Sequence, residues 1–144
     1  MISGVENIKK FLPQREPMIM VDTLLGHVDG ATKSSFLIAE DNVFVSQNRF
    51  TEAGLLENMA QTAALGKGFE CSEKNENPPL GFIGAVKGLY INRLPKVNDI
   101  IETQITPKHE VLNASIVDAA VSLNGEMIAG CELKIFINPQ IHES

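Results

Sequence analysis

Residues 51–69 constrain the fold most strongly, because they combine a helical pattern with a surface that is apolar on most sides. Thr51 is suited to cap the first turn, and the Glu52 carboxylate suits the positive end of the helix dipole. A helix of this kind, rich in alanine and glycine, has to be buried, so we expect the rest of the chain to pack around it. The pattern rests on apolar residues at helical spacing: Leu55, Leu56, Met59, Ala60, Ala63 and Ala64.

The segments on both sides of this helix have the composition and turn signals of β-strands. Asp-Gly at residues 29–30 and Asn-Gly at residues 124–125 mark turns, the second of them between paired strands. A short helix is expected at residues 4–11, and an irregular connection at residues 40–50. The strands are expected at residues 17–28, 31–39, 80–95, 98–111, 112–125 and 126–139.

This order of elements predicts an α+β protein in which one curved, mostly antiparallel sheet wraps one long central helix. The length of 144 residues predicts a single domain over residues 1–144.

Composition narrows the class of protein. The net charge of −6 argues against a general nucleic-acid binder, which would carry a basic surface. No run of 18 apolar residues occurs, and the N-terminus lacks the features of a signal peptide, so we expect no membrane span and a cytoplasmic location. The cysteines, Cys71 and Cys131, lack the spacing of a metal site and are expected to be reduced thiols.

Glu57 stands on a stripe of small residues within the predicted helix. The residues within about 60° of it around the helix axis are Ala53, Gly54, Ala60, Gln61, Ala64 and Gly68. Small residues leave room either for another backbone or for a ligand. A carboxylate in apolar surroundings must find a partner or take up a proton, and a protonated carboxyl is what a general acid provides. The alternative is a structural ion pair at a surface or at a helix contact.

Other polar residues offer weaker signals. His27, His109 and His142 lack metal-like spacing, and a structural or solvated role is expected for each. Residues 87–98 carry three cations and no acid, which is either scattered solvated charge or a docking patch for an acidic partner. The cations of that segment are Lys87, Arg93 and Lys96.

Three segments together resemble the β-hydroxyacyl-acyl-carrier-protein dehydratases of fatty-acid synthesis. Residues 12–25, "LPQREPMIMVDTLL", resemble the N-terminal "LPHR-P---VD" signature of that family. Residues 54–65, "GLLENMAQTAAL", resemble its "LLEAMAQ" central-helix motif, and residues 81–101 resemble the strand and turn that follow. The resemblance covers nearly the whole chain and implies the hotdog fold.

The resemblance also implies a reaction. In that family, water is eliminated from a 3-hydroxyacyl thioester to give a trans-2-enoyl product. A loop histidine removes the α proton, a helix carboxylate protonates the leaving hydroxyl, and backbone N–H groups at the helix start polarise the carbonyl. The histidine and the carboxylate of each site come from different subunits of a dimer, with the acyl chain in an apolar tunnel. No metal or redox cofactor is needed.

The site residues carry over position by position. The carboxylate is Glu57, and Gln61 lies one turn further on, where it could orient Glu57. The small residues that would leave space for the substrate are Ala53, Gly54, Ala60 and Ala64.

The chain departs from the family pattern at two of the three catalytic elements. Gln14 occupies the position of the histidine, and an amide has no useful basicity near neutral pH. Thr51 and Glu52 stand where the family has Pro and Gly, and the preceding loop is shortened to residues 46–50. Gln14 could still orient a thioester by hydrogen bonding.

Three functions therefore compete. The first is a dehydratase-like enzyme that acts on acyl-carrier-protein thioesters in fatty-acid or polyene-like lipid synthesis. It would work alone, as a homodimer or higher oligomer, or as a heterodimer subunit that supplies Glu57 to a histidine-bearing paralogue. The second is a non-catalytic module that binds acyl thioesters. The third is a thioesterase in which Glu57 activates water.

Overall fold

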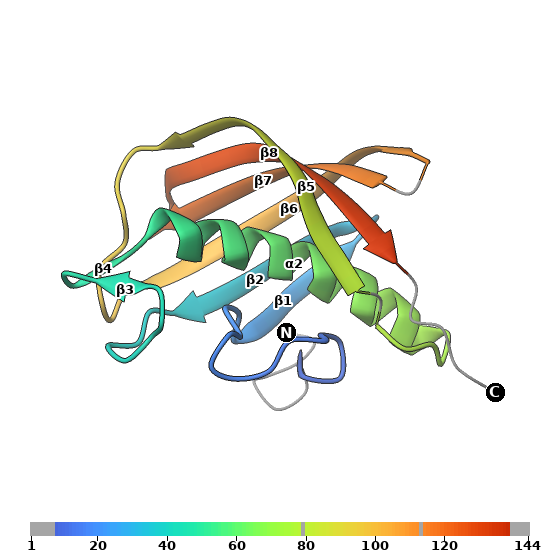
Figure 1. The fold of residues 1–144 in the computed structure, drawn as a ribbon, viewed down its shortest axis with the longest axis horizontal. Helices are drawn as coiled ribbons and strands as arrows, with labels where there is room; N and C mark the ends of the chain where they lie inside the picture. The colour runs from blue at the N-terminus through green and yellow to red at the C-terminus, as the bar shows by residue number, and fades with distance from the viewer. Residues whose placement is uncertain (1–7, 79, 113, 139–144) are drawn as a thin grey trace.

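The computed structural model describes residues 8–78, 80–112 and 114–138 (Figure 1). Its secondary structure consists of one long helix and strands on both sides of it in the sequence. The elements are β1 Thr23–Val28, β2 Ala31–Leu37, β3 Val45–Ser46, β4 Arg49–Phe50, α2 Glu52–Glu73, β5 Leu80–Ile91, β6 Ile100–Val111, β7 Ala114–Leu123 and β8 Glu126–Asn138.

The six long strands form one antiparallel sheet in the order β1-β2-β6-β7-β8-β5. The helix α2 lies across one face of this curved sheet and contacts β2, β5, β6 and β7 (Figure 1). The predicted α+β architecture, one helix against a curved antiparallel sheet, is therefore confirmed. Strand β5 pairs with β8 and lies at one edge of the sheet, beside the helix.

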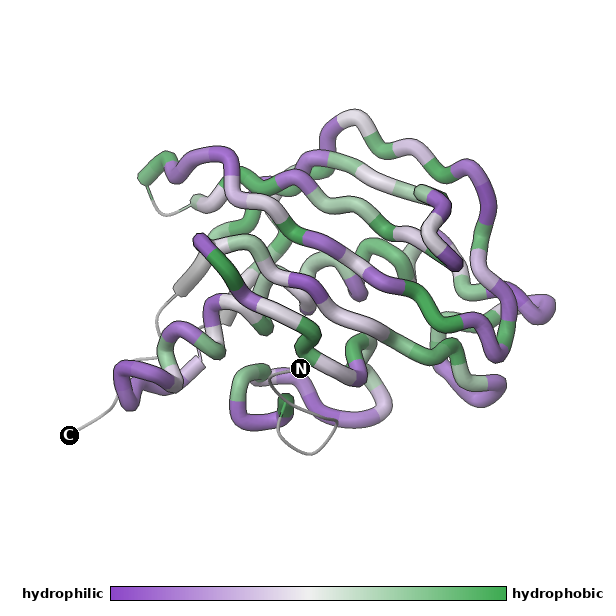
Figure 2. Tube along the Cα trace, turned by 180° about the vertical axis from the view of Figure 1, so that it is seen from behind, coloured by the Kyte–Doolittle hydropathy of each residue, from purple (hydrophilic) through white to green (hydrophobic). Residues whose placement is uncertain are grey.

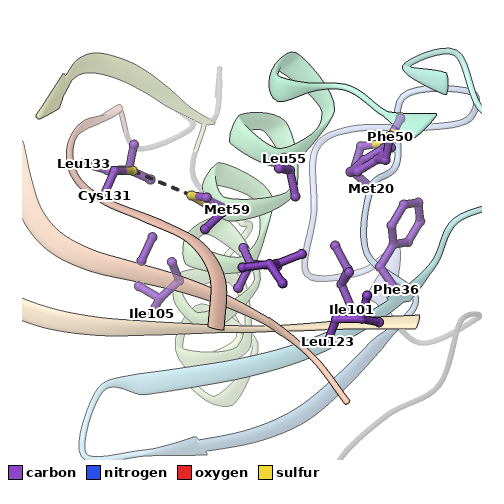
Figure 3. Packing of buried hydrophobic residues seen from close by; sticks show 14 of the residues in the cluster. Met20, Phe36, Phe50, Leu55, Met59, Ile101, Ile105, Leu123, Cys131 and Leu133 are labelled. Carbon is purple, nitrogen blue, oxygen red and sulfur yellow. Dashed lines mark hydrogen bonds between the residues drawn. The ribbon is translucent and has the colours of Figure 1, made fainter. Parts of the chain in front are cut away.

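The core fills the space between α2 and the sheet. Hydrophobic and hydrophilic residues alternate along the strands (Figure 2), as expected for a sheet with one covered face. Leu55 and Met59 of the helix are fully buried and face Ile105 and Leu133 of the sheet (Figure 3). The Cys131 thiol lies 3.6 Å from the Met59 sulfur in this core.

The signals at turns and at the helix start are confirmed. Thr51 is the N-cap of α2, and its hydroxyl accepts a hydrogen bond from the Gly54 N–H. Asn124 and Gly125 form a two-residue turn between β7 and β8, with φ angles of 53° and 83°. The left-handed conformation at both positions is the one that Asn-Gly hairpins favour.

Two expectations about the first half of the chain are wrong. Residues 17–22 are not a strand, because side chains of α2 take the backbone hydrogen bonds that a sheet would use. The Met20 N–H donates to Gln61, and the Met18 and Met20 carbonyls accept from Gln61 and Asn58. Residues 40–50 are not wholly irregular, since β3 and β4 form a small hairpin there.

The segment before β1 packs against the C-terminal half of α2. The first half of the expected helix at residues 4–11 falls outside the described residues, and residues 9–11 form a turn. Ile8 and Leu12 are buried with Val21, Leu24 and Leu65 in a second apolar cluster. The same segment brings the backbone of Phe11 against α2 at Gly68, where a Cβ atom would lie 1.8 Å from the Phe11 carbonyl oxygen.

Gly68→Ala is expected to lower the free energy of unfolding by about 1–3 kcal/mol, because the helix must move away from a backbone atom. Helix propensity alone would raise the free energy of unfolding, because alanine is favoured over glycine in a helix by up to about 1 kcal/mol. Gly26→Ala is a suitable control, since no atom lies within 4 Å of its added Cβ. Urea denaturation of the two variants measures the difference, and a stabilised Gly68→Ala protein would contradict this packing.

Candidate active site

A cavity of about 300 Å³ opens between the middle of α2, the loop before β1 and the sheet edge at β5. It brings together two of the residues that carry the predicted chemistry, Gln14 and Glu57. Its other walls are almost wholly apolar. The full lining is Gln14, Glu57, Ala60, Ala64, Gly81, Phe82, Ile83 and Ile135.

The Glu57 carboxylate is held in place by its neighbour one turn along the helix. Gln61 is fully buried, and its Nε2 donates to Glu57 Oε2 at 2.8 Å. The same nitrogen donates to the Met18 carbonyl at 2.7 Å, and Gln61 Oε1 accepts from the Met20 N–H at 2.6 Å. Because every one of these polar groups of Gln61 is engaged, its side chain has one orientation, and this orientation fixes the direction of the Glu57 carboxylate.

Asn58, like Gln61, binds the loop before β1 through its side-chain amide. Its Nδ2 donates to the Met20 carbonyl at 2.7 Å, and its Oδ1 accepts from the Thr103 hydroxyl of β6 at 2.5 Å. Sequence reasoning missed this residue, although a signal existed: an amide beside Glu57 on a buried helix stands where the resembled motif "LLEAMAQ" has alanine. Together, Asn58 and Gln61 attach residues 18–20 to α2.

Gln14 also lines the cavity. The Arg15 guanidinium closes its loop by donating to the Leu12 and Gln14 carbonyls at 2.8 and 2.7 Å. The Gln14 Oε1 atom is buried and has no hydrogen-bond partner among the described residues. Gln14 and Glu57 of one chain therefore line the same cavity.

The small-residue stripe serves two purposes in the structure. Ala60 and Ala64 line the cavity beside Glu57, so at these positions small side chains leave open space. The other predicted substrate-binding residues lie elsewhere: Ala53 is exposed, and Gly54 is buried where an added Cβ would lie 2.6 Å from the Phe50 ring. At Gly54 the absence of a side chain instead allows Phe50 of β4 to pack closely against the helix.

The first turn of α2 does not line this cavity. One of its backbone N–H groups, that of Gly54, points to the Thr51 hydroxyl at 3.5 Å, and that hydroxyl donates to the Phe44 carbonyl at 2.8 Å. The carbonyl-polarising donors that the resemblance implies at the helix start are therefore not part of the cavity formed by Gln14 and Glu57.

The predicted cationic patch is partly neutralised. Arg93 forms an ion pair with Glu126 at 2.9 Å, and Lys87 lies opposite Glu132 in the β5–β8 register. A β-bridge between the backbones of Arg49 and Lys96 adds a fourth cation, Arg49, to the patch. Sequence reasoning missed this residue. Among the described ion pairs, none involves Lys96 or Arg49.

The histidines have the expected structural character where they are described. His27 is bonded through Nε2 to Glu70 at 2.7 Å and through Nδ1 to Thr32 at 2.9 Å, and His109 is exposed. His142 lies outside the described residues. The His27–Glu70 pair lines a second cavity under the C-terminal half of α2, which shares Ala64 and Ile135 with the first cavity.

Both cysteines are free thiols. Cys131 is buried in the core, and desolvation raises the pKa of its thiol to about 11. No group of three potential metal-ligating side chains occurs within the part of the chain that the structure describes. None of the helices in that part is long and apolar enough to span a membrane.

One long helix packed against a curved antiparallel sheet defines the class of proteins with the hotdog fold. Among solved structures, the dehydratase heterocomplex ApeI:P from Xenorhabdus doucetiae superposes with a TM-score of 0.84 at 16% identity, covering 92% of this chain and 91% of that chain. A hypothetical thioesterase with coenzyme A from Streptococcus pneumoniae TIGR4 gives a TM-score of 0.63 at 11% identity, covering 83% and 88%.

The sequence comparisons specify the family. The model of the ApeP-like family, described as ApeP dehydratase, matches residues 6–144, and the chain belongs to this family. The chain is also 26% identical over 142 residues to the 3-hydroxyacyl-[acyl-carrier-protein] dehydratase FabZ of Latilactobacillus sakei, covering 92% of this chain and 96% of that protein. The corresponding FabZ of Shewanella loihica is 22% identical over 135 residues, covering 90% and 88%.

Proposed function

We propose that this chain is one subunit of a 3-hydroxyacyl-acyl-carrier-protein dehydratase and that Glu57 is its general acid. The observation that carries the proposal is the Glu57 carboxylate, held by Gln61 at the wall of a cavity whose lining is apolar apart from Glu57 and Gln14. An acid held in one orientation in such surroundings can protonate a leaving hydroxyl group without reorganisation.

The base of the reaction is expected to come from another chain. Gln14 cannot accept the α proton, and no histidine lines the cavity among the described residues. A partner base would remove the proton from C2, whose electron pair forms the C2–C3 double bond. The C3–O bond then breaks, and the hydroxyl leaves as water with the proton of Glu57. The similarity in fold to a subunit of a dehydratase heterocomplex agrees with this division of roles.

The acyl chain is expected to follow the apolar side of α2. Ala60, Ala64 and Ile135 form the wall beyond Glu57, and Ala64 and Ile135 also line the second cavity. The two spaces together would give an extended acyl chain a path along the helix, away from the polar groups that react.

A thioesterase is the second candidate, because a hypothetical thioesterase shares the fold and Glu57 could activate water instead. Product analysis distinguishes the functions. The purified chain, combined with a histidine-bearing paralogue, is incubated with a 3-hydroxyacyl carrier-protein thioester. A dehydratase subunit yields the enoyl thioester, a thioesterase yields the free acid, and a non-catalytic binding module yields neither although it retains the ligand.

We place the working form in the cytoplasm as a dimer or higher oligomer.

The carrier protein is expected to dock on the cationic residues Lys87, Arg93 and Lys96, with Arg49 beside them. Charge reversal at Lys96, which has no acidic partner among the described ion pairs, should weaken binding of the acidic carrier several-fold at low salt. Titration calorimetry of Lys96→Glu at two salt concentrations tests this, with Lys33→Glu on β2, away from these residues, as the control. Affinity that responds neither to Lys96→Glu nor to salt would contradict the docking site.

A further inference from the structure

Two cavities follow one another along α2. The cavity that contains Glu57 has a volume of about 300 Å³, and the helix lines it with Glu57, Ala60 and Ala64. The second cavity, of about 80 Å³, is lined by Ala64 and by its neighbours on the helix as far as Glu70. Ala64 of α2 and Ile135 of β8 belong to both linings. The two cavities therefore meet at these two side chains, one on the helix and one on the sheet.

The helix contributes only a methyl group to this junction. Ala64 is half-buried, and a larger side chain at this position would extend into the space that both cavities border. The sheet lines the second cavity with the apolar side chains of Ile105, Ile116 and Val117. The volume of this cavity is enough for several groups of the size of a methylene. The second cavity is thus suited to the end of a hydrocarbon chain that passes Ala64.

Polar side chains border the second cavity beyond Ala64. His27 Nε2 is bonded to Glu70 Oε2 at 2.7 Å, and Lys67 Nζ forms an ion pair with Glu110 Oε1 at 3.4 Å. A hydrocarbon chain that covered these groups would remove them from water, which is unfavourable. An apolar chain is therefore expected to end before it reaches them.

The positions of these residues along the helix give the length of such a chain. Ala64 lies seven residues beyond Glu57, and Lys67 lies ten residues beyond it. At about 1.5 Å per residue, these separations are about 10 and 15 Å. An extended chain advances by about 1.2 Å per bond. A chain whose third carbon lies at Glu57 therefore passes Ala64 at about its twelfth carbon and reaches Lys67 at about its fifteenth.

We propose that Ala64 determines the acyl chain length that the site accepts, and that the preferred substrate carries a straight chain of about 12 to 15 carbons whose end lies in the second cavity. This proposal rests on the proposed function, which places the third carbon of the chain beside Glu57. A chain of about ten carbons ends in the first cavity and gains nothing from the second. A chain of about fourteen carbons passes Ala64 and buries its last methylene groups in the second cavity.

Binding of three matched probes tests the proposal without turnover. The probes are the 3-hydroxyhexanoyl, 3-hydroxydecanoyl and 3-hydroxytetradecanoyl amides of pantetheine, in which nitrogen replaces the thioester sulfur. Titration calorimetry on the wild-type chain should show the tetradecanoyl probe binding at least about tenfold more tightly than the decanoyl probe, because each buried methylene contributes up to about fourfold. Ala64→Leu fills the junction and should reduce this ratio to about one. Its affinity for the hexanoyl probe should change by less than about twofold.

Ala63→Leu provides a second test, because Ala63 lines the second cavity and not the first. It should also reduce the ratio of the two longer probes, while its affinity for the decanoyl probe stays at the wild-type value. Ala53→Leu is the matched control, since Ala53 is exposed on the same helix and lines neither cavity. It should leave the ratio unchanged.

A ratio near one in the wild-type chain, or an undiminished ratio in Ala64→Leu, overturns the assignment of Ala64 while leaving acyl binding in place. Urea denaturation shows whether Ala64→Leu is folded, and if it is not, the ratio in Ala63→Leu decides in the same way. If none of the three probes binds the wild-type chain, the proposed function fails together with this inference.

Discussion

Glu57→Gln is expected to lower enoyl formation by about 10²- to 10⁴-fold in a complex of this chain with a histidine-bearing partner, the usual cost of losing a general acid or base. Glutamine keeps the size of the side chain and can still bond to Gln61, but it has no proton to give to the leaving hydroxyl. The measurement is the initial rate of enoyl thioester formation from a 3-hydroxyacyl carrier protein.

Glu73→Gln provides the control, because Glu73 is exposed at the far end of α2 and its neutralisation should leave the rate unchanged. The affinity of the substrate should change much less than the rate, since Glu57 acts on the bond that breaks. A Glu57→Gln complex with wild-type turnover would show that the acid lies elsewhere.

Asn58→Ala is expected to lower the free energy of unfolding by about 2–4 kcal/mol, because it leaves two buried groups without partners. These groups are the Met20 carbonyl and the Thr103 hydroxyl, bonded to the two ends of the Asn58 amide. Alanine favours the helix by less than about 1 kcal/mol and offsets only part of this loss. Urea denaturation of the variant gives the value.

A double-mutant cycle with Thr103→Val isolates the interaction, because the two side chains share one hydrogen bond. Once valine has replaced Thr103, removal of Asn58 should cost distinctly less than it does in the wild-type protein. Fully additive losses, or a loss below about 0.5 kcal/mol for Asn58→Ala alone, would mean that the amide does not hold the loop on the helix.

Much of the fold follows from local patterns in the sequence. The apolar surface of α2, its Thr51 cap and the Asn-Gly turn at residues 124–125 each depend on the residues immediately around them, and each is confirmed. The segment at residues 17–22 could not be assigned in this way. Its apolar pattern is that of a strand, but its backbone bonds to Asn58 and Gln61, which lie some forty residues away in the sequence.

The candidate site was only partly predictable for the same reason. The sequence pattern and the resemblance identified Glu57, Gln61 and Gln14, and the structure brings these three residues to one region. Helical geometry could not distinguish Ala60, which lines the cavity, from Gly54, which packs against Phe50, because that difference depends on which segment lies opposite the helix. The pairing of Arg93 with Glu126 likewise depends on strand register.

The central claim is that this chain supplies a working acid, Glu57, and carries no base at position 14. It is tested most directly by enoyl formation from a 3-hydroxyacyl carrier-protein thioester, measured for the purified chain and for Gln14→His side by side. We expect no enoyl product above the buffer control from the wild-type chain alone and measurable turnover from Gln14→His. Efficient turnover by the wild-type chain alone, undiminished in Glu57→Gln, would contradict this account.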